Sequence, residues 1–207
     1  MYSITVPVVI KTGLIHQQEM TLYYPRLYSL QNGYVQHIIN QEIFNVINNL
    51  VKLQYQEQNT TNFAEMLGTF ELKTNERNIV SIAFSNYAIF PYAAHGLTLM
   101  KSLTVDTLTG ASYQLNNLFK KNSNYVEVLS KKIAEQIAER NITTLEPFIS
   151  IRPDQDFYIA DKSLVIYFQQ YELAAYVYGL PMFPISVFEL EGIITEEGPL
   201  GRMATNS

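Results

Sequence analysis

The sequence has no cysteine, no tryptophan and few charged side chains. Without cysteine the chain forms no disulfide, uses no thiol nucleophile and binds no zinc through sulfur. Only 16% of its 207 residues are charged, whereas 47% are hydrophobic. That balance is typical of a folded globular protein, because disordered chains combine low hydrophobicity with high net charge. A chain of this length buries a sizeable core, in one large domain or two small ones.

Basic clusters and long apolar runs are also missing. The formal net charge is -5, and the only adjacent lysines are Lys120-Lys121 and Lys131-Lys132. Nucleic-acid binding is not expected, because it needs a basic surface. No apolar run reaches the roughly 20 residues of a membrane-spanning helix. The first residues lack the pattern of a signal peptide, which predicts either a cytoplasmic protein or a chain whose natural start has been trimmed.

The motifs of nucleotide binding and serine hydrolysis do not occur. The chain contains neither G-x-x-x-x-G-K-[ST] nor G-x-G-x-x-G, which would cradle phosphates. It also lacks the G-x-S-x-G nucleophile elbow. The three histidines, His16, His37 and His95, are far apart in the sequence, so a metal site would need the fold to bring them together with carboxylates. We predict no metal site and no cofactor.

The first half of the chain predicts strands around one long helix. Residues 3–10 alternate and are β-branched, which predicts a strand. A turn is predicted at 11–13, and a second strand at 20–24 with Pro25 as its end. From 34 to 55, apolar residues recur at three- and four-residue spacings, as in an amphipathic helix. Further strands are predicted at 70–75, 79–88 and 97–106, the first two joined as a hairpin.

The second half predicts one more helix and a second set of strands. A tight turn at 106–110 leads toward a helix for which Ser123 is the predicted N-cap. Residues 164–168 form the clearest strand, and 184–190 predict a last short one. Residues 191–207 contain Gly192, Gly198 and Gly201 with little apolar periodicity, which predicts a loose tail.

The order of these elements predicts an α+β fold with antiparallel or mixed sheets and two main helices. Neither a regular strand-helix alternation nor a repeat of fixed period is present. We expect two small subdomains packed together. The first is a strand-helix-hairpin subdomain at 1–90, with its boundary near the loop of His95 and Gly96. The second is an α+β subdomain at 91–190, followed by the loose tail 191–207.

One loop combines a histidine with small residues, in the sequence FPYAAHG at 90–96. His95 could hydrogen-bond a ligand or act as a general base. Alternatively, Gly96 supplies a special backbone geometry and His95 caps local carbonyls. The second interpretation is favoured because no nucleophile is visible. An acid-base pair drawn from Asp154, Asp156, Asp161 and Glu172 is a further alternative, although aspartates in turns usually bind their own backbone.

The stretch from Tyr158 to Pro184 has the most aromatic groups beside the fewest charges. Tyr167 lies in the predicted strand 164–168 and is expected in the core. The other tyrosines lie in a loop at 171–178. Tyrosine is favoured at protein interfaces because it buries much area at low entropic cost. The alternative is a corner of the core whose hydroxyl groups bond to the backbone, and the sequence leaves both open.

Several segments, taken in order, resemble a known family. They are YAAHG at 92–96, TVDTLTG at 104–110, LNNLF at 115–119, DFYI at 156–159 and LVIYFQQYELAAY at 164–176, closed by Gly179 and residues 185–190. Their order is similar to that of the extracellular domain of RsiV anti-sigma factors and related uncharacterised bacterial proteins, over about residues 88–190. The first part of the chain resembles the smaller domain that commonly precedes it.

The resemblance implies a non-enzymatic α+β domain outside the membrane of Gram-positive bacteria, which in RsiV is a receptor for lysozyme. The expected function is a non-catalytic binding module of the cell envelope, with a lysozyme-like protein or a cell-wall glycan as ligand. The chain departs from RsiV in showing no transmembrane or sigma-binding segment, and Ala94 stands where the family often has glycine.

The expected ligand-binding surface combines the loop of His95 with residues 171–181, and we predict no catalytic residue. Two alternatives remain, namely a cell-wall hydrolase that uses His95 with Asp106 or Glu172, and a structural or assembly protein. The residues favour a non-catalytic domain over an enzyme, and they set neither the ligand nor the oligomeric state. The candidate binding residues are His95, Gly96, Tyr171, Glu172, Tyr176, Tyr178 and Pro181.

Overall fold

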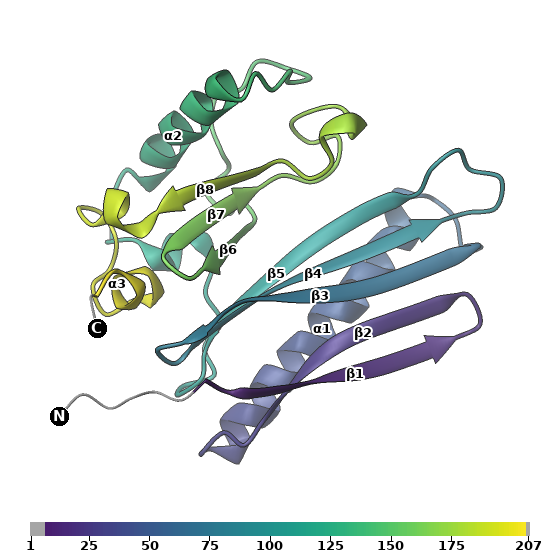
Figure 1. The fold of residues 1–207 in the computed structure, drawn as a ribbon, viewed down its shortest axis with the longest axis horizontal. Coiled ribbons are helices and arrows are strands. Elements are labelled where there is room, and N and C mark those ends of the chain that lie inside the picture. Colours follow the sequence, from purple (N-terminus) through teal and green to yellow (C-terminus); the bar gives the residue numbers. More distant parts are fainter. Residues whose placement is uncertain (1–6, 206–207) are drawn as a thin grey trace. The chain divides into compact units, whose positions relative to one another are not determined.

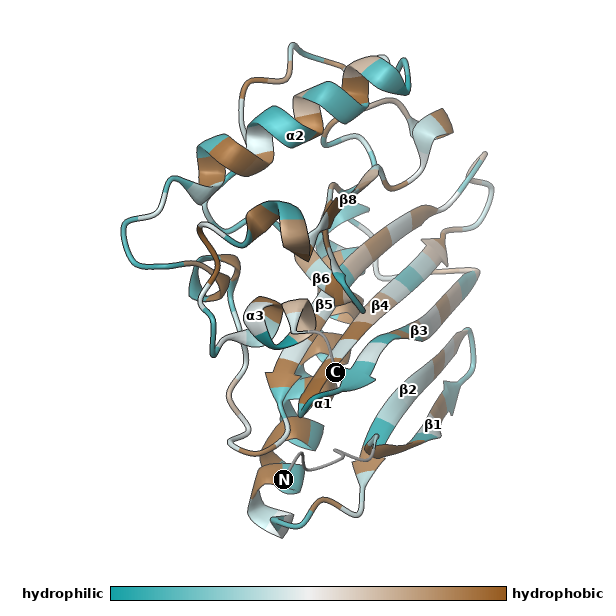
Figure 2. Ribbon diagram, turned by 60° about the vertical axis from the view of Figure 1, so that its left-hand side comes forward, coloured by the Kyte–Doolittle hydropathy of each residue, from teal (hydrophilic) through white to brown (hydrophobic). Residues whose placement is uncertain are grey.

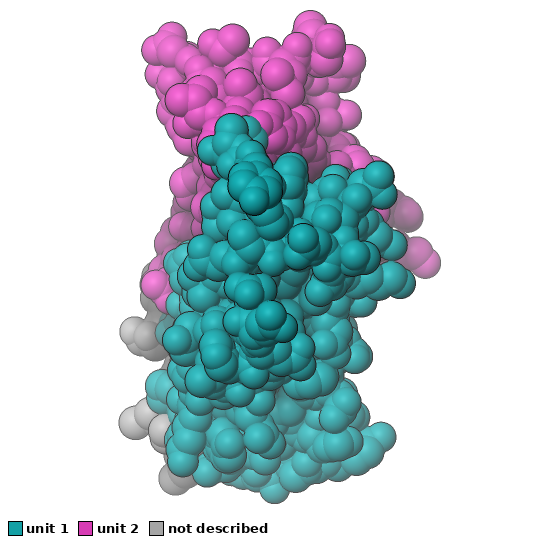
Figure 3. All heavy atoms as spheres, turned by 90° about the vertical axis from the view of Figure 1, so that its right-hand side faces the viewer, with its two compact units in different colours: residues 1–112 teal, residues 113–207 magenta. Residues whose placement is uncertain are grey.

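The structure, a computed structural model, describes residues 7–205 and is an α+β fold, as predicted (Figure 1). Its contacts divide the chain into two compact units, residues 1–112 and residues 113–207, which are coloured separately in Figure 3. The boundary expected from the sequence near His95 differs from this division, because that loop connects two neighbouring strands inside the sheet of unit 1.

Unit 1 is a five-stranded sheet with one long helix packed on it (Figure 1). The strands follow the spatial order β1-β2-β3-β4-β5. All neighbours are antiparallel except β2 and β3, which run parallel, so the sheet is mixed. The bounds are β1 Val9–Gln17, β2 Met20–Tyr28, α1 Gly33–Glu57, β3 Glu65–Glu76, β4 Ile79–Ile89 and β5 Leu97–Asp106.

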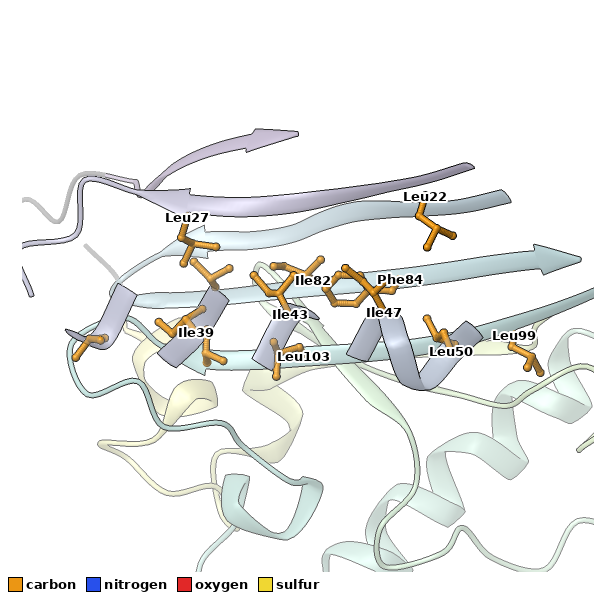
Figure 4. Close-up of a cluster of buried hydrophobic side chains, with 13 residues drawn as sticks. Leu22, Leu27, Ile39, Ile43, Ile47, Leu50, Ile82, Phe84, Leu99 and Leu103 are labelled. Carbon is orange, nitrogen blue, oxygen red and sulfur yellow. The ribbon is translucent and has the colours of Figure 1, made fainter. Parts of the chain in front are cut away.

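The predicted amphipathic helix is confirmed and supplies one side of the core of unit 1. Asn32 caps α1, since its side-chain oxygen accepts from the backbone amides of Tyr34 and Val35. The buried residues of α1 recur at three- and four-residue spacings, so their side chains lie on one face of the helix. Figure 4 shows that face directed at the sheet. The labelled side chains are Ile39, Ile43, Ile47 and Leu50 of α1 with Leu22, Leu27, Ile82, Phe84, Leu99 and Leu103 of the strands.

The predicted turn at 11–13 is wrong, because these residues lie inside the uninterrupted strand β1. Gly13 has a packing role there. A Cβ atom at this position would lie 2.4 Å from the ring of Tyr24, which covers the glycine from β2. Of the strand predicted at 3–10, residues 3–6 lie outside the described residues, and β1 begins at Val9.

Pro25 lies within β2 and does not end it, contrary to the prediction. β2 pairs with β3 only over Met20–Leu22. Further along, the side chain of Asn40 replaces a strand partner for Leu27, accepting from its N–H at 2.9 Å and donating to its carbonyl at 3.0 Å. Backbone directions alternate along a strand, so Pro25 also points away from β1, where no ladder N–H is needed.

The predicted hairpin and the strand after it are confirmed. Arg77 and Asn78 join β3 to β4, and both have positive φ, 53° and 60°. Two such residues form the type I′ turn that matches the twist of a hairpin. β5 has the predicted bounds, and at its end the carboxylate of Asp106 accepts from the amides of Leu108 and Thr109 at 2.8 and 3.0 Å.

Two glutamine side chains fasten the end of α1 to β4 and β5. Gln54 is fully buried, and its Nε2 donates to the carbonyls of Asn86 at 2.6 Å and Leu97 at 3.0 Å. Gln58 donates to Gln54 Oε1 at 2.8 Å and to the carbonyl of Ala88 at 3.1 Å. These carbonyls stand on both sides of the loop between β4 and β5. The hydrogen bonds of Gln54 and Gln58 therefore fix the two ends of that loop.

Unit 2 contains a three-stranded antiparallel sheet in the order β6-β7-β8. The predicted strand 164–168 is confirmed as core, and Tyr167 is fully buried. Helix α2 buries Leu129 and Ile133, and hydrophobic and hydrophilic bands alternate along it in Figure 2. The bounds are α2 Tyr125–Glu139, β6 Phe157–Ala160, β7 Ser163–Tyr167, β8 Met182–Ser186 and α3 Pro199–Ala204, with short 3-10 helices at Leu115–Leu118, Tyr176–Tyr178 and Val187–Leu190.

Two boundaries in unit 2 differ from the sequence prediction. The residue before α2 is Asn124 and not Ser123, because the amide of Ser123 donates to the carbonyl of Lys120 in the preceding turn. The last predicted strand, 184–190, is a strand only as far as Ser186 and then becomes the 3-10 helix Val187–Leu190.

The structure also differs from the predicted loose tail at 191–207, of which it describes the part up to residue 205. Ile194, Leu200 and Met203 are buried, and α3 lies within this segment. The amide of Thr195 donates to the carbonyl of Leu118 at 3.1 Å, and Ile194 forms a β-bridge with Phe119. These apolar residues are too widely spaced to show a period, yet each fills a place in the core.

An ion pair between α2 and the 3-10 helix after β8 gives a pH-dependent prediction. The ammonium group of Lys132 donates to the carboxylate of Glu189, and this bond lowers the pKa of Glu189. A pKa lowered by folding adds stability above the unfolded pKa, about 4.3 for glutamate, and loses it as the pH falls through the folded value. Because Glu189 is half exposed, the contribution stays below about 1 kcal/mol.

We expect an NMR titration to give Glu189 a lower pKa in the wild type than in Lys132→Met. The lysine supplies both the hydrogen bond and the positive charge, so its removal returns the carboxylate toward its ordinary pKa. An unchanged Glu189 pKa in Lys132→Met would contradict this interpretation of the pair.

Candidate functional site

The candidate site residues lie in two segments of the chain, one in each unit. Within 7–205, no group of three or more histidine and acidic side chains is placed to hold a metal ion. No helix in that range is long and apolar enough to cross a membrane. The sequence-predicted site residues divide between the units. His95 and Gly96 lie in unit 1, and the five others lie in unit 2.

The β4–β5 loop, residues 90–96, forms one wall of a surface pocket of about 410 Å³. Glu57 and Gln58 at the end of α1 form the other wall. His95 is exposed, and its Nδ1 lies 3.2 Å from the carbonyl oxygen of Gly96. Gly96 is buried, and a Cβ there would lie 2.4 Å from the ring of Tyr87. Glycine is therefore required at 96 by close packing.

The hydrolase alternative needs an acidic partner near His95, and Asp106 does not supply one. His95 precedes β5, whereas Asp106 ends this 10-residue strand, about 30 Å away at the usual rise per residue. Asp106 is also 2% exposed and accepts from the turn that follows it. The carboxylate that lines the pocket with His95 is Glu57.

The loop of residues 171–178, here called the tyrosine loop, displays apolar side chains to solvent. Val177 is 85% exposed, and Tyr171, Tyr176 and Tyr178 are 48%, 37% and 37% exposed. The rings of Tyr171 and Tyr176 lie against each other, with centroids 5.9 Å apart. The core-corner interpretation thus does not describe these side chains. The hydroxyl group of Tyr178 does bond to the backbone, as that interpretation expected.

The tyrosine loop is held in place by hydrogen bonds to the segment 143–145. The hydroxyl oxygen of Tyr178 accepts from the amide of Thr143 at 3.1 Å, and hydrogen bonding with the side chain and then the backbone of Thr143 lowers the pKa of Tyr178. The amide of Leu145 donates to the carbonyl of Leu173 at 2.9 Å. Gly179, with φ 62°, ends the loop in a backbone geometry that suits glycine. The loop therefore has a defined conformation and does not depend on burial of its exposed side chains.

Glu172 anchors the beginning of the tyrosine loop. One carboxylate oxygen accepts from Arg152 Nη1 and from Gln155 Nε2, the latter at 3.2 Å. The other oxygen accepts from the backbone amide of Gln169 at 2.7 Å. Pro181 is buried, and its carbonyl accepts from the amide of Phe168 at 3.0 Å. Both residues hold the loop, whereas the three tyrosines provide its exposed surface.

Sequence reasoning missed two exposed residues. Val177 is the most exposed member of the tyrosine loop, and Tyr92 is fully exposed at the tip of the β4–β5 loop, with φ 66°. Positive φ is uncommon for a tyrosine. Pro91 and Ala93 on either side of Tyr92 indicate a turn, but the sequence does not show that the Tyr92 ring lies in solvent. For Val177, the signal was its place between two tyrosines outside any strand.

Comparison with known proteins agrees with the resemblance seen in the sequence. Residues 116–187 match the family DUF3298, described as protein of unknown function. This DUF3298 segment contains the whole tyrosine loop. The chain is also 27% identical over 195 residues to the anti-sigma-V factor RsiV of Bacillus subtilis (strain 168). That match covers 87% of this chain and 67% of RsiV.

Solved structures of DUF3298 proteins share this fold. A member from Bacteroides fragilis NCTC 9343 matches with a TM-score of 0.71 at 12% identity, covering 99% of this chain and all of that one. A second, from Pseudomonas aeruginosa PAO1, matches with a TM-score of 0.63 at 13% identity, covering 100% of this chain and 99% of that one. The fold is therefore common to proteins of low sequence identity.

Proposed function

We propose that this chain is a non-catalytic binding module of the bacterial cell envelope that binds a protein through the tyrosine loop. The observation that carries the proposal is the display of four apolar side chains within eight residues, on a backbone fixed at both ends. Aromatic residues dominate the energetics of protein interfaces, and charged residues are depleted at their centres. The one charged residue of the loop, Glu172, is already engaged by Arg152 and Gln155.

The chemistry of the loop favours a protein over a cell-wall glycan. Val177 presents an aliphatic side chain that is 85% exposed and has no hydrogen-bonding group to offer a sugar hydroxyl. An apolar recess on a protein would bury it favourably. The similarity to RsiV, an anti-sigma factor by name, supports a role in protein recognition. A lysozyme-like protein is the ligand that this resemblance implies, so lysozyme is the probe of choice.

We expect lysozyme to bind the wild type, and Val177→Asp to weaken binding at least about tenfold, or roughly 1.4 kcal/mol. An aspartate there would have to be desolvated on contact with the partner. Ile149→Asp is the matched control, because Ile149 is an aliphatic side chain of the same unit that is 88% exposed but lies outside the loop. Isothermal titration calorimetry at physiological salt measures all three proteins.

Absence of lysozyme binding at micromolar protein would contradict the lysozyme-like ligand, and an equal loss in Ile149→Asp would contradict the loop as its site. Soluble peptidoglycan fragments form the second arm. Binding of these fragments that Val177→Asp does not change would favour the glycan alternative. His95→Ala should leave binding unchanged, and loss of measurable turnover in that variant would favour the hydrolase.

A further inference from the structure

β1 is a regular edge strand of nine residues. It stands at one end of the strand order of unit 1 (Figure 1). Its nine residues pair with β2 without a register shift, from Val9 opposite Tyr28 to Gln17 opposite Met20. Its other side has no neighbouring strand within the part of the chain that the structure describes. A row of backbone donors and acceptors therefore lies along that side.

The contact between Asn40 and Leu27 identifies the residues that present this row. Both backbone groups of Leu27 bond to the Asn40 side chain, so they do not face β1. Ile10 lies opposite Leu27, and in an antiparallel ladder two opposed residues either bond to each other or both point away. Ile10 therefore points outward. The period of two extends this direction to Thr12, Leu14 and His16.

β1 lacks the features that normally protect an edge strand from pairing. Natural edges are kept short or carry prolines, bulges or several charges. β1 has no proline, no bulge and a single charged residue, Lys11. Two of its apolar side chains, Val9 and Leu14, are 48% and 57% exposed. Such an edge is a template for another strand.

We propose that two copies of this chain associate through β1, pairing antiparallel about a two-fold axis at Gly13. This inference is independent of the proposed function. In this register Ile10 of one copy lies opposite His16 of the other, and Thr12 lies opposite Leu14. Every outward residue then meets an outward residue, and each such pair exchanges two hydrogen bonds. A symmetric contact of this kind closes at the dimer.

The side chains of β1 are compatible with this register. Lys11 lies opposite Ile15 of the other copy, so the lysines of the two copies do not oppose each other. At the axis, Gly13 of one copy lies opposite Gly13 of the other, and the absence of side chains allows the two strands to approach closely. Like charges directly opposite each other would destabilise the pair, and none are present. The interface is small, so we expect a reversible dimer with a Kd on the order of 100 µM.

Sedimentation equilibrium from about 5 µM to 1 mM protein tests the proposal. The mass of the wild type should rise from that of one chain toward that of two. Thr12→Pro removes one outward N–H without touching the bonds to β2, and Leu14→Lys places a charge at the contact. Both variants should remain monomeric. Leu72→Lys is the matched control, since Leu72 is a strand leucine that is 44% exposed in β3, and it should dimerise normally.

Amide exchange measured by NMR at low and high concentration locates the contact. The amides of Ile10, Thr12, Leu14 and His16 should become protected as the concentration rises, whereas the intervening amides, already bonded to β2, should not change. A wild type that stays monomeric to 1 mM overturns the proposal. So does a dimer that persists in folded Leu14→Lys, or concentration-dependent protection confined to another region.

Discussion

Gln54→Leu is expected to lower the free energy of unfolding by about 3 kcal/mol. The amide of Gln54 donates to the carbonyls of Asn86 and Leu97, and the glutamine is fully buried. Leucine has a similar volume but leaves both carbonyls buried without this donor, at about 1–3 kcal/mol for each unsatisfied group. Gln58 also loses the acceptor for its own amide.

Urea unfolding followed by circular dichroism measures this effect. Gln56→Leu is the matched control, because Gln56 lies on the same turn of α1 with an exposed side chain, and we expect it to change stability by less than about 0.5 kcal/mol. If Gln54→Leu lowers the free energy of unfolding by less than about 1 kcal/mol, the hydrogen bonds of Gln54 do not contribute to stability as proposed. Equal losses in both variants would indicate that helix propensity, and not the buried amide, is responsible.

Glu172→Ala is expected to weaken lysozyme binding about 30-fold, or roughly 2 kcal/mol, without any change to the exposed apolar side chains of the tyrosine loop. Glu172 joins Arg152, Gln155 and the backbone of Gln169, and it thereby fixes the beginning of the loop. Without it, the partner must order the loop on binding, which reduces affinity. This prediction rests on the proposed function.

A positioning role for Glu172 has its own signature. Amide exchange in the free protein should become faster across 169–178 in Glu172→Ala, whereas Val177→Asp should leave it unchanged. Glu191→Ala serves as the control, since Glu191 is an exposed glutamate of the same unit. If Glu172→Ala binds as tightly as the wild type, preorganisation of the loop by this carboxylate is excluded.

The fold was largely predictable wherever the pattern was local. The spacing of apolar residues predicted α1, the turn expected at 75–78 predicted the β3–β4 hairpin, and the bounds of β5 were correct. The prediction was wrong where contacts with residues distant in the sequence determine the local conformation. Pro25 lies inside β2 because its nitrogen faces away from β1, on the side where Asn40 of α1 bonds to Leu27. Residues 191–205 do not form a loose tail, because Ile194 pairs with Phe119 and is buried. The sequence around Pro25 or Ile194 does not indicate either contact.

The sequence predicted where the candidate site lies better than it predicted the role of each residue in it. The tyrosine loop was found by its composition, but the anchoring by Glu172 depends on Arg152 and Gln155, which are distant in sequence. The exposure of Val177 follows from the bonds that Tyr178 and Leu173 make to the 143–145 segment. A joint surface of His95 with the tyrosine loop stays a prediction, since the two lie in different units.

Hydrogen–deuterium exchange of the wild type with saturating lysozyme tests the central claim most directly. If the tyrosine loop is the binding surface, the strongest new protection falls on residues 171–178 and on the paired segment 143–145. The β4–β5 loop at 90–96 provides the internal comparison. Protection confined to that loop, or protection absent from 171–178 while lysozyme is bound, would contradict the account.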